Sequence, residues 1–201
     1  MSEQSFQKAE NIFREHGGVL STKKAMESGI HPRTLYAMRD EGVLETVSRG
    51  RYRLAELPPL SNLDLATVAL RVPNGVICLV SALDFYALTT EIPHGVHVAL
   101  ERGSEEPRIE WPPVRIFKFS GPAFTEGVED HELDGIPVHI YCPAKTIADC
   151  FKFRNKIGLD VAIEALKSYQ KTSSFIVREL MHFARVCRVE NVMRPYVEAL
   201  L

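Results

Sequence analysis

The chain has 201 residues, of which 45% are hydrophobic and 25% are charged, as in an ordinary globular protein and unlike a disordered one. The formal net charge of −2 excludes a protein that holds nucleic acid through an overall basic field. No apolar stretch reaches the length of a membrane span and no hydrophobic signal core opens the chain, so we expect a soluble, cytoplasmic protein.

The first thirty residues predict two helices. Apolar residues recur at helical spacing at Phe6, Ala9, Ile12 and Phe13. Gly17 stops this helix, because glycine accepts the left-handed conformation that ends one. Ser21 or Thr22 caps the next helix, which Gly29 closes.

A third helix opens at Pro32, which needs no intrahelical N–H bond at a first position, and ends at Gly42. Leu35 and Met38 are expected to face inward. The opposite face carries four residues near its N-terminal end, namely Arg33, Thr34, Tyr36 and Ala37. Those are the positions that a groove-docked recognition helix presents to base edges.

A β-hairpin follows this helix. Val47 and Tyr52 flank its tip, where Gly50 permits the positive φ of a type I′ turn. Arginine side chains, which suit phosphate oxygens or a narrow minor groove, cluster there at Arg49, Arg51 and Arg53. Residues 21–53 hold seven Lys or Arg against four Asp or Glu, so this part of the chain is locally basic.

Three helices followed by an arginine-tipped hairpin are typical of a winged helix-turn-helix. We therefore predict a DNA-binding domain at residues 1–56. Its predicted DNA contacts are Lys23, Lys24, Arg33, Thr34, Tyr36, Ala37, Arg49, Arg51 and Arg53. The alternative is a purely structural or protein-docking module.

Residues 57–201 form the predicted second domain, which begins with a Pro-rich connector at 57–62. Helices are expected at 62–71, 81–88, 143–153, 159–169, 173–187 and 190–200, with Ser81 as the cap of the second. Strands are expected at 75–80, 96–100, 114–119, 129–133 and 136–141, the last two joined by Asp134-Gly135. The predicted fold class is α+β, with a winged helix-turn-helix followed by a mixed α/β domain that ends in a helical tail.

The four cysteines have no C-x-x-C spacing and lie in apolar runs. They are Cys78, Cys142, Cys150 and Cys187. We expect small buried side chains in a reducing cytoplasm and no disulfide framework.

The chain as a whole resembles the AbiEi-family antitoxins, the regulator half of a bacterial toxin–antitoxin and phage-defence system. The resemblance rests on residues 13–18, 31–44 and 48–53, and in the second domain on residues 78–83, 88–90 and 143–158. It implies an autorepressor that binds inverted repeats in its own promoter. It also implies an antitoxin that counteracts a nucleotidyltransferase-type toxin through the second domain. We expect no enzyme activity, no cofactor and no metal, in a monomer or weak dimer.

Two further patterns bear on possible chemistry. His94 and His97 are three apart, which places them on opposite faces of a strand, so we interpret them as surface or loop residues and not as metal ligands.

Lys145 and Asp149 have the i,i+4 spacing of a helical ion pair. The alternative is a docking surface for toxin or DNA, made of Lys145, Asp149, Lys152, Arg154 and Lys156. A nuclease-like α/β domain tethered to the DNA-binding module remains the competing functional class.

Overall fold

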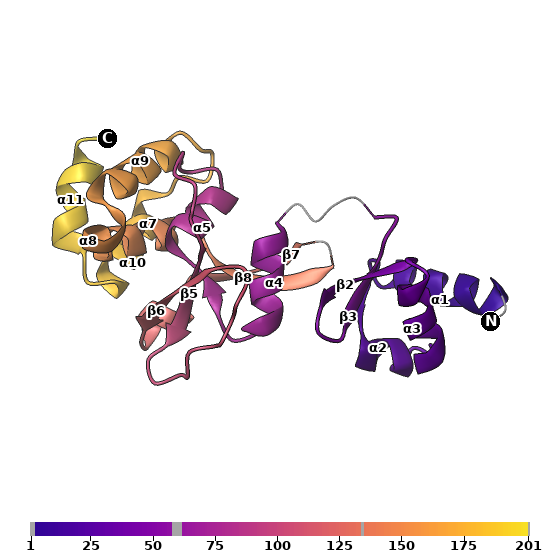
Figure 1. The fold of residues 1–201 in the computed structure, drawn as a ribbon. Coiled ribbons are helices and arrows are strands. Elements are labelled where there is room, and N and C mark those ends of the chain that lie inside the picture. The colour runs from indigo at the N-terminus through magenta and orange to yellow at the C-terminus, as the bar shows by residue number, and fades with distance from the viewer. Residues whose placement is uncertain (1–2, 58–61, 134, 201) are drawn as a thin grey trace. The chain divides into compact units, whose positions relative to one another are not determined.

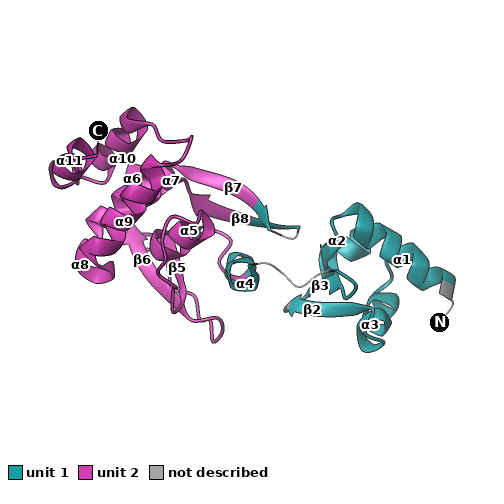
Figure 2. Cartoon of the chain, turned by 90° about the horizontal axis from the view of Figure 1, so that it is seen from above, with its two compact units in different colours: residues 1–70, 132–137 teal, residues 71–131, 138–201 magenta. Residues whose placement is uncertain are grey.

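The chain forms two compact units, and each is described by itself. The computed structural model describes residues 3–57, 62–133 and 135–200 (Figure 1). Unit 1 comprises residues 1–70 and 132–137, and unit 2 comprises residues 71–131 and 138–201 (Figure 2). The predicted connector at 57–62 lies mostly outside the described residues, and the predicted domain boundary beside it stays a prediction.

Unit 1 begins with three helices and a small sheet. Its elements are α1 (Glu3–Glu15), β1 (Val19–Ser21), α2 (Thr22–Glu27), α3 (Pro32–Asp40), β2 (Leu44–Ser48), β3 (Arg51–Leu54) and, after the gap, α4 (Leu63–Arg71), whose last residue belongs to unit 2. The strands form an antiparallel sheet in the order β1-β3-β2, with Leu20 opposite Tyr52. The sequence does not predict strand β1, because three residues are too few to display a period.

The three N-terminal helices share one core. Phe13, Leu35 and Met38 have no exposed surface, and Leu44 and Leu54 of the sheet pack in the same cluster. The predicted inward face of α3 is therefore confirmed. Burial of one such side chain contributes roughly 1.5–3 kcal/mol, which explains why short helices with few internal hydrogen bonds persist here.

Side-chain caps fix where α2 and α3 begin. The Ser21 hydroxyl accepts the Lys24 backbone N–H at 3.1 Å, so Ser21 and not Thr22 is the cap. His31 caps α3, because its Nδ1 accepts the Arg33 backbone N–H at 3.2 Å while Pro32 occupies the first turn. The sequence does not predict the histidine cap.

Unit 2 contains most of a five-stranded mixed sheet. Its strands are β4 (Val76–Ile77), β5 (Val96–Glu101), β6 (Val114–Phe119), β7 (Val128–Leu133) and β8 (Ile136–Tyr141), in the order β6-β5-β4-β8-β7. The β5–β6 and β4–β8 pairs are parallel, whereas β4–β5 is antiparallel. The α+β class is thereby confirmed. Of the predicted Asp134-Gly135 turn, Asp134 lies outside the described residues.

Helices bury one face of this sheet. They are α5 (Leu79–Phe85), α6 (Pro122–Thr125), α7 (Pro143–Lys152), α8 (Arg154–Ile157), α9 (Leu159–Gln170), α10 (Val177–Val186) and α11 (Glu190–Glu198). Helices α5, α7, α9, α10 and α11 share a core with strand residues such as Phe117 and Tyr141. All four cysteines are buried free thiols, as expected. Among the described residues, no helix is both long enough and apolar enough to cross a membrane.

The predicted strand at 75–80 is wrong beyond Ile77. Leu79 and Val80 open α5, and the helix cap is Cys78, which forms no side-chain cap bond. Ser81, predicted as the cap, lies inside the helix, where its hydroxyl accepts the backbone N–H of His97 at 2.9 Å. A short apolar run buried on all sides has no polar face, so its periodicity cannot distinguish a strand from a helix.

Candidate nucleic-acid interface

One face of α3 is open to solvent. Arg33 and Tyr36 are exposed and Ala37 is half-buried, whereas Leu35 on the opposite face is fully buried. Thr34 is the exception among the predicted contacts, because only 9% of it is exposed. Its position, one turn before the buried Met38, turns it toward the core, so its burial does not support the predicted contact of Thr34 with DNA.

The two ends of this face differ in charge. At the C-terminal end the guanidinium of Arg39 lies 5.3 Å from the ring centroid of Tyr36 and donates to Asp40 at 2.6 Å. Arg39 is therefore held by an anion that would repel phosphate. Arg33 at the N-terminal end forms no ion pair with any residue of 3–57, so the electropositive end of the helix is its start.

The hairpin of β2 and β3 has a glycine-dependent tip. Gly50 adopts φ +72°, as predicted for the second tip position. The strand pairing shifts register between Thr46 and Ser48, which adds a bulge that the predicted regular type I′ hairpin does not have. The Gly50 carbonyl is bound by Thr22 at the start of α2. The hairpin tip and the first turn of α2 therefore lie together.

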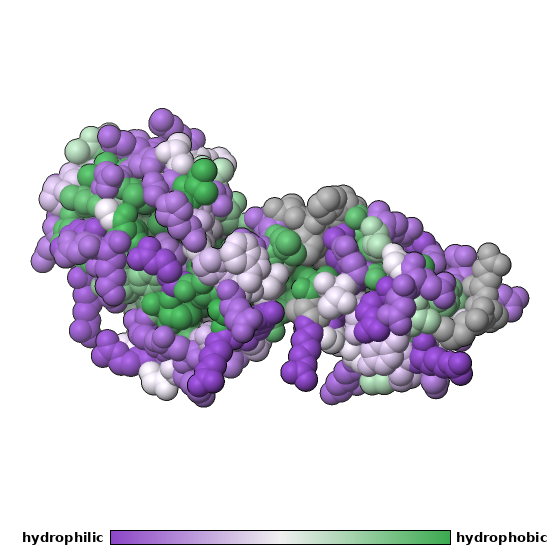
Figure 3. Space-filling model, viewed as in Figure 1, coloured by the Kyte–Doolittle hydropathy of each residue, from purple (hydrophilic) through white to green (hydrophobic). Residues whose placement is uncertain are grey.

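This arrangement groups the cations of two elements. Lys23 and Lys24 on α2 and Arg49 at the hairpin tip are exposed, and Arg51 is half-buried. Lys23 lies 4.0 Å from Glu27, while the other three form no ion pair within residues 3–57. Figure 3 shows that hydrophilic side chains cover much of the visible face of this unit. Lys24, Arg49 and Arg51 are therefore available to an external anion such as a phosphate.

Arg53 does not belong to this cluster. It is only 4% exposed, and its Nη1 donates to Glu45 Oε1 at 2.5 Å across the paired strands. Successive residues of a strand point to opposite faces, so Arg51 and Arg53, two apart, share a face and differ only in depth. The burial of Arg53 and its ion pair with Glu45 do not support the predicted contact of this residue with DNA.

Part of the sequence matches a known protein family. Residues 7–55, which we term the AbiEi segment, match the family model described as "Transcriptional regulator, AbiEi antitoxin". The expected resemblance is confirmed over this segment. The AbiEi segment contains α2, α3 and the hairpin, together with α1 from residue 7 onward, so it carries every cation of the cluster. A comparison with curated protein sequences gives no match.

The fold also matches a solved structure. The crystal structure of the RV2827C protein from Mycobacterium tuberculosis superposes with a TM-score of 0.60. The match covers 91% of this chain and 71% of that one, at 13% sequence identity. At 13% identity the match shows that the two proteins share a fold. Because it covers 91% of this chain, the shared fold includes unit 2 as well as the AbiEi segment.

The predicted docking block in unit 2 does not form one surface. Lys145 and Asp149 have no exposed surface, and they pair with each other at 2.5 Å. The ion-pair interpretation is confirmed, and the docking interpretation is wrong for these two residues. Burial raises the pKa of Asp149, while the Lys145 ammonium and the Cys187 thiol, which donates to it at 3.1 Å, oppose that shift.

The other three members of the block have separate roles. Lys152 and Lys156 are exposed. Arg154 is half-buried, and its Nη1 donates to the carbonyl of Phe151 at 2.8 Å, which satisfies one of the free carbonyls at the end of α7. The use of Lys152, Arg154 and Lys156 by a partner remains a prediction.

The interpretation of both histidines as surface or loop residues is wrong for His97. His97 lies in β5 and is 4% exposed, whereas His94 is exposed. Their positions in the sequence could have distinguished the buried histidine from the exposed one, because His97 falls inside an apolar strand pattern and His94 precedes it. No group of three or more potential metal ligands occurs among residues 3–57, 62–133 and 135–200.

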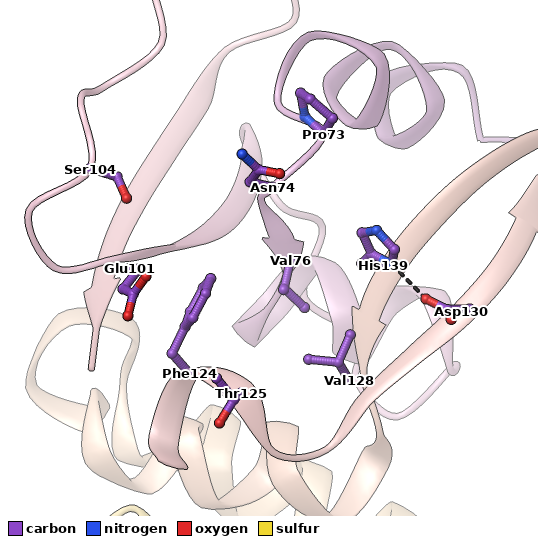
Figure 4. A pocket seen from close by; sticks show the side chains of 10 residues that line it. All are labelled: Pro73, Asn74, Val76, Glu101, Ser104, Phe124, Thr125, Val128, Asp130 and His139. Carbon is purple, nitrogen blue, oxygen red and sulfur yellow. Dashed lines mark hydrogen bonds and ion pairs between the residues drawn. The ribbon is translucent and has the colours of Figure 1, made fainter. Parts of the chain in front are cut away.

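A hollow of about 520 Å³ in unit 2 bears on the nuclease alternative (Figure 4). Val76, Phe124 and Val128 give it apolar walls, and the carboxylates of Glu101 and Asp130 lie on opposite sides of it. His139 binds Asp130 at 2.6 Å. A two-carboxylate metal site needs both groups directed at one point, so this arrangement gives the nuclease alternative no support.

Proposed function

We propose that this protein is a DNA-binding transcriptional regulator in which residues 7–55 act as a winged helix-turn-helix. In this proposal α3 enters the major groove and the β2–β3 hairpin contacts the DNA backbone. The observation that carries it is the placement of Arg33 and Tyr36 on the open face of α3 while Leu35 is buried. The match to a regulator family over the same residues supports it.

We further propose the finer role that the family description suggests. The protein would repress its own promoter by binding inverted repeats, and it would counteract a nucleotidyltransferase-type toxin as part of antiviral defence. The family description names both regulation and antitoxin activity. We assign the antitoxin activity to residues 57–201, because part of the resemblance to the AbiEi-family antitoxins rests on residues 78–83 and 143–158.

A binding assay on the full chain tests the regulator role. Fluorescence anisotropy would compare a duplex from upstream of the protein's own gene with a scrambled duplex of equal length. The triple variant Arg33→Ala, Arg49→Ala, Arg51→Ala should lose the preference for the promoter duplex. The exposed Lys167 of unit 2 supplies the control, since Lys167→Ala removes a charge without touching the AbiEi segment.

A growth assay tests the antitoxin role separately. The triple variant, expressed from an unrelated promoter, should still protect cells that express the neighbouring toxin gene while failing to repress the native promoter. Loss of both activities in a folded triple variant contradicts the division of roles. Equal binding of wild-type protein to promoter and scrambled DNA contradicts the regulator proposal itself.

A further inference from the structure

A second hollow in unit 2, of about 170 Å³, lies where the parallel strands β5 and β6 begin. Four of its lining residues carry or can accept positive charge: His94 just before β5, His97 in β5, Arg115 in β6 and Lys156 in α8. Because water occupies about 30 Å³ per molecule, the hollow has room for on the order of five waters, or for one tetrahedral oxyanion.

His97 supplies a buried polar group without a partner. The residue is 4% exposed, and its Nδ1 has no hydrogen-bond partner among the described residues. Its backbone is fully engaged, since the N–H donates to Ser81 and the carbonyl accepts from Cys78. An unsatisfied buried polar atom is costly, and a ligand that forms a hydrogen bond with Nδ1 would remove that cost.

Arg115 and Lys156 make the hollow electropositive. Arg115 is the register partner of His97 in the parallel β5–β6 pair, so both side chains stand on the same face of the sheet. Lys156 reaches the same region, since its Nζ lies 5.9 Å from the ring centroid of Phe117, which also contacts His97. Neither cation forms an ion pair within the part of the chain that the structure describes. Glu91 is the one carboxylate among the described lining residues.

We propose that this hollow is an anion site that binds a phosphate group, held by Arg115 and Lys156 and by a ring N–H of His97. Guanidinium and ammonium groups form charge-assisted hydrogen bonds with phosphate oxygens, and Arg115 offers the bidentate geometry that phosphate prefers. The small volume restricts the site to the phosphate itself. Any organic remainder of a phosphate ester would extend past His94 and the exposed Ile92 at the rim.

The protonation of His97 agrees with this geometry. Burial, together with the charge of Arg115, lowers the pKa of His97 to about 4, so the ring is neutral at pH 7 and carries one N–H. Glu91, His94, Arg115 and Lys156 are the titratable groups that line the hollow with it. A bound anion favours the imidazolium, so ligand binding is expected to raise the pKa of His97.

Calorimetric titration of the full chain with inorganic phosphate, at constant ionic strength against chloride, tests the proposal. Wild-type protein should bind saturably with one site. Arg115→Gln and Lys156→Gln should each weaken binding about tenfold or more, because each removes a charged donor. Both residues are exposed, so these variants are expected to fold, and Arg108→Gln is the matched control on an exposed loop. Absence of saturable binding, or equal binding by Arg115→Gln, overturns the proposal.

Two additional measurements sharpen the result. Titration with a nucleoside monophosphate distinguishes the source of the phosphate: tighter binding than inorganic phosphate assigns the site to a phosphate ester, and equal binding assigns it to the free ion. Histidine ring NMR supplies an independent readout. Saturating sulfate, which stays a dianion, should move the titration of His97 to higher pH. An unchanged His97 titration under saturation removes His97 from the site.

Discussion

Thr22 holds the hairpin tip through two hydrogen bonds to one atom of Gly50. Its backbone N–H and its hydroxyl both donate to the Gly50 carbonyl oxygen, at 2.8 and 3.1 Å. The tip is therefore fastened to the first turn of α2 and does not project as a free loop. This fixes the backbone that carries Arg49 and Arg51, which reduces the backbone entropy that the hairpin loses on binding.

Gly50→Ala should destabilise the protein by roughly 1–2 kcal/mol, because φ +72° places an L side chain in the left-handed region. An added Cβ would approach only the Thr22 hydroxyl, at 3.5 Å, so backbone strain and not a clash causes the loss. Urea unfolding measures it. Gly50→Asn, which tolerates this conformation better, should lose less, and an equal loss in both variants would argue against strain as the cause.

Arg33→Ala should weaken binding to the promoter duplex by about 1–3 kcal/mol if the guanidinium pairs with a guanine edge. Arg33 lies in the first turn of α3, on the open face. Mobility shifts on promoter and scrambled duplexes measure the effect. A variant that binds both duplexes as the wild type does would show that Arg33 reads no base.

Replacement of Arg49 and Arg51 by alanine should weaken binding to every duplex and leave sequence preference intact, because phosphate contacts carry no base information. The slope of log affinity against log salt concentration should flatten by roughly one unit for each phosphate that the variant no longer neutralises. Anisotropy at four salt concentrations gives the slope. A slope equal to that of the wild type would place the hairpin away from the DNA.

Lys145→Met should destabilise unit 2 by about 3–5 kcal/mol, because it leaves Asp149 as an uncompensated carboxylate with no exposed surface. Lys145 Nζ also lies 4.0 Å from the ring centroid of Tyr141, so the substitution removes a cation–π interaction. The double variant Lys145→Met, Asp149→Leu should be more stable than Lys145→Met alone. Denaturant unfolding of the three proteins tests this, and a double variant less stable than the single one refutes the charge argument.

The lowered pKa of His97 makes the free energy of unfolding depend on pH. Its pKa is about 4 in the folded state, below the ordinary value of 6.5, so the unfolded chain takes up a proton first as the pH falls. The free energy of unfolding should therefore fall by about 2 kcal/mol between pH 7 and pH 5 through this residue. Urea unfolding at both pH values, in a buffer without phosphate, measures it. His97→Gln should lack this component, and an identical pH dependence in that variant would exclude His97 as its source.

The sequence by itself determined the order of elements in the AbiEi segment. Helical periodicity, Pro32 at a helix start and Gly50 at a turn are local signals, and each acts within a few residues of its own position. Those signals correctly predicted α1, α2, α3, the hairpin and the inward face of α3. They also predicted the i,i+4 pairing of Lys145 with Asp149, since that spacing is a property of one helix.

Only the tertiary structure decided how deeply each of these side chains lies. The sequence predicts Thr34 and Arg53 as surface residues, but only 9% and 4% of them are exposed. In α7, eight consecutive residues from Ala144 to Phe151 are buried, because the helix has packed neighbours on every side. His97 and Arg115 are eighteen positions apart and meet only because β5 and β6 pair in parallel. Such contacts depend on chain segments that are distant in sequence, and no local pattern records which segments will pack together.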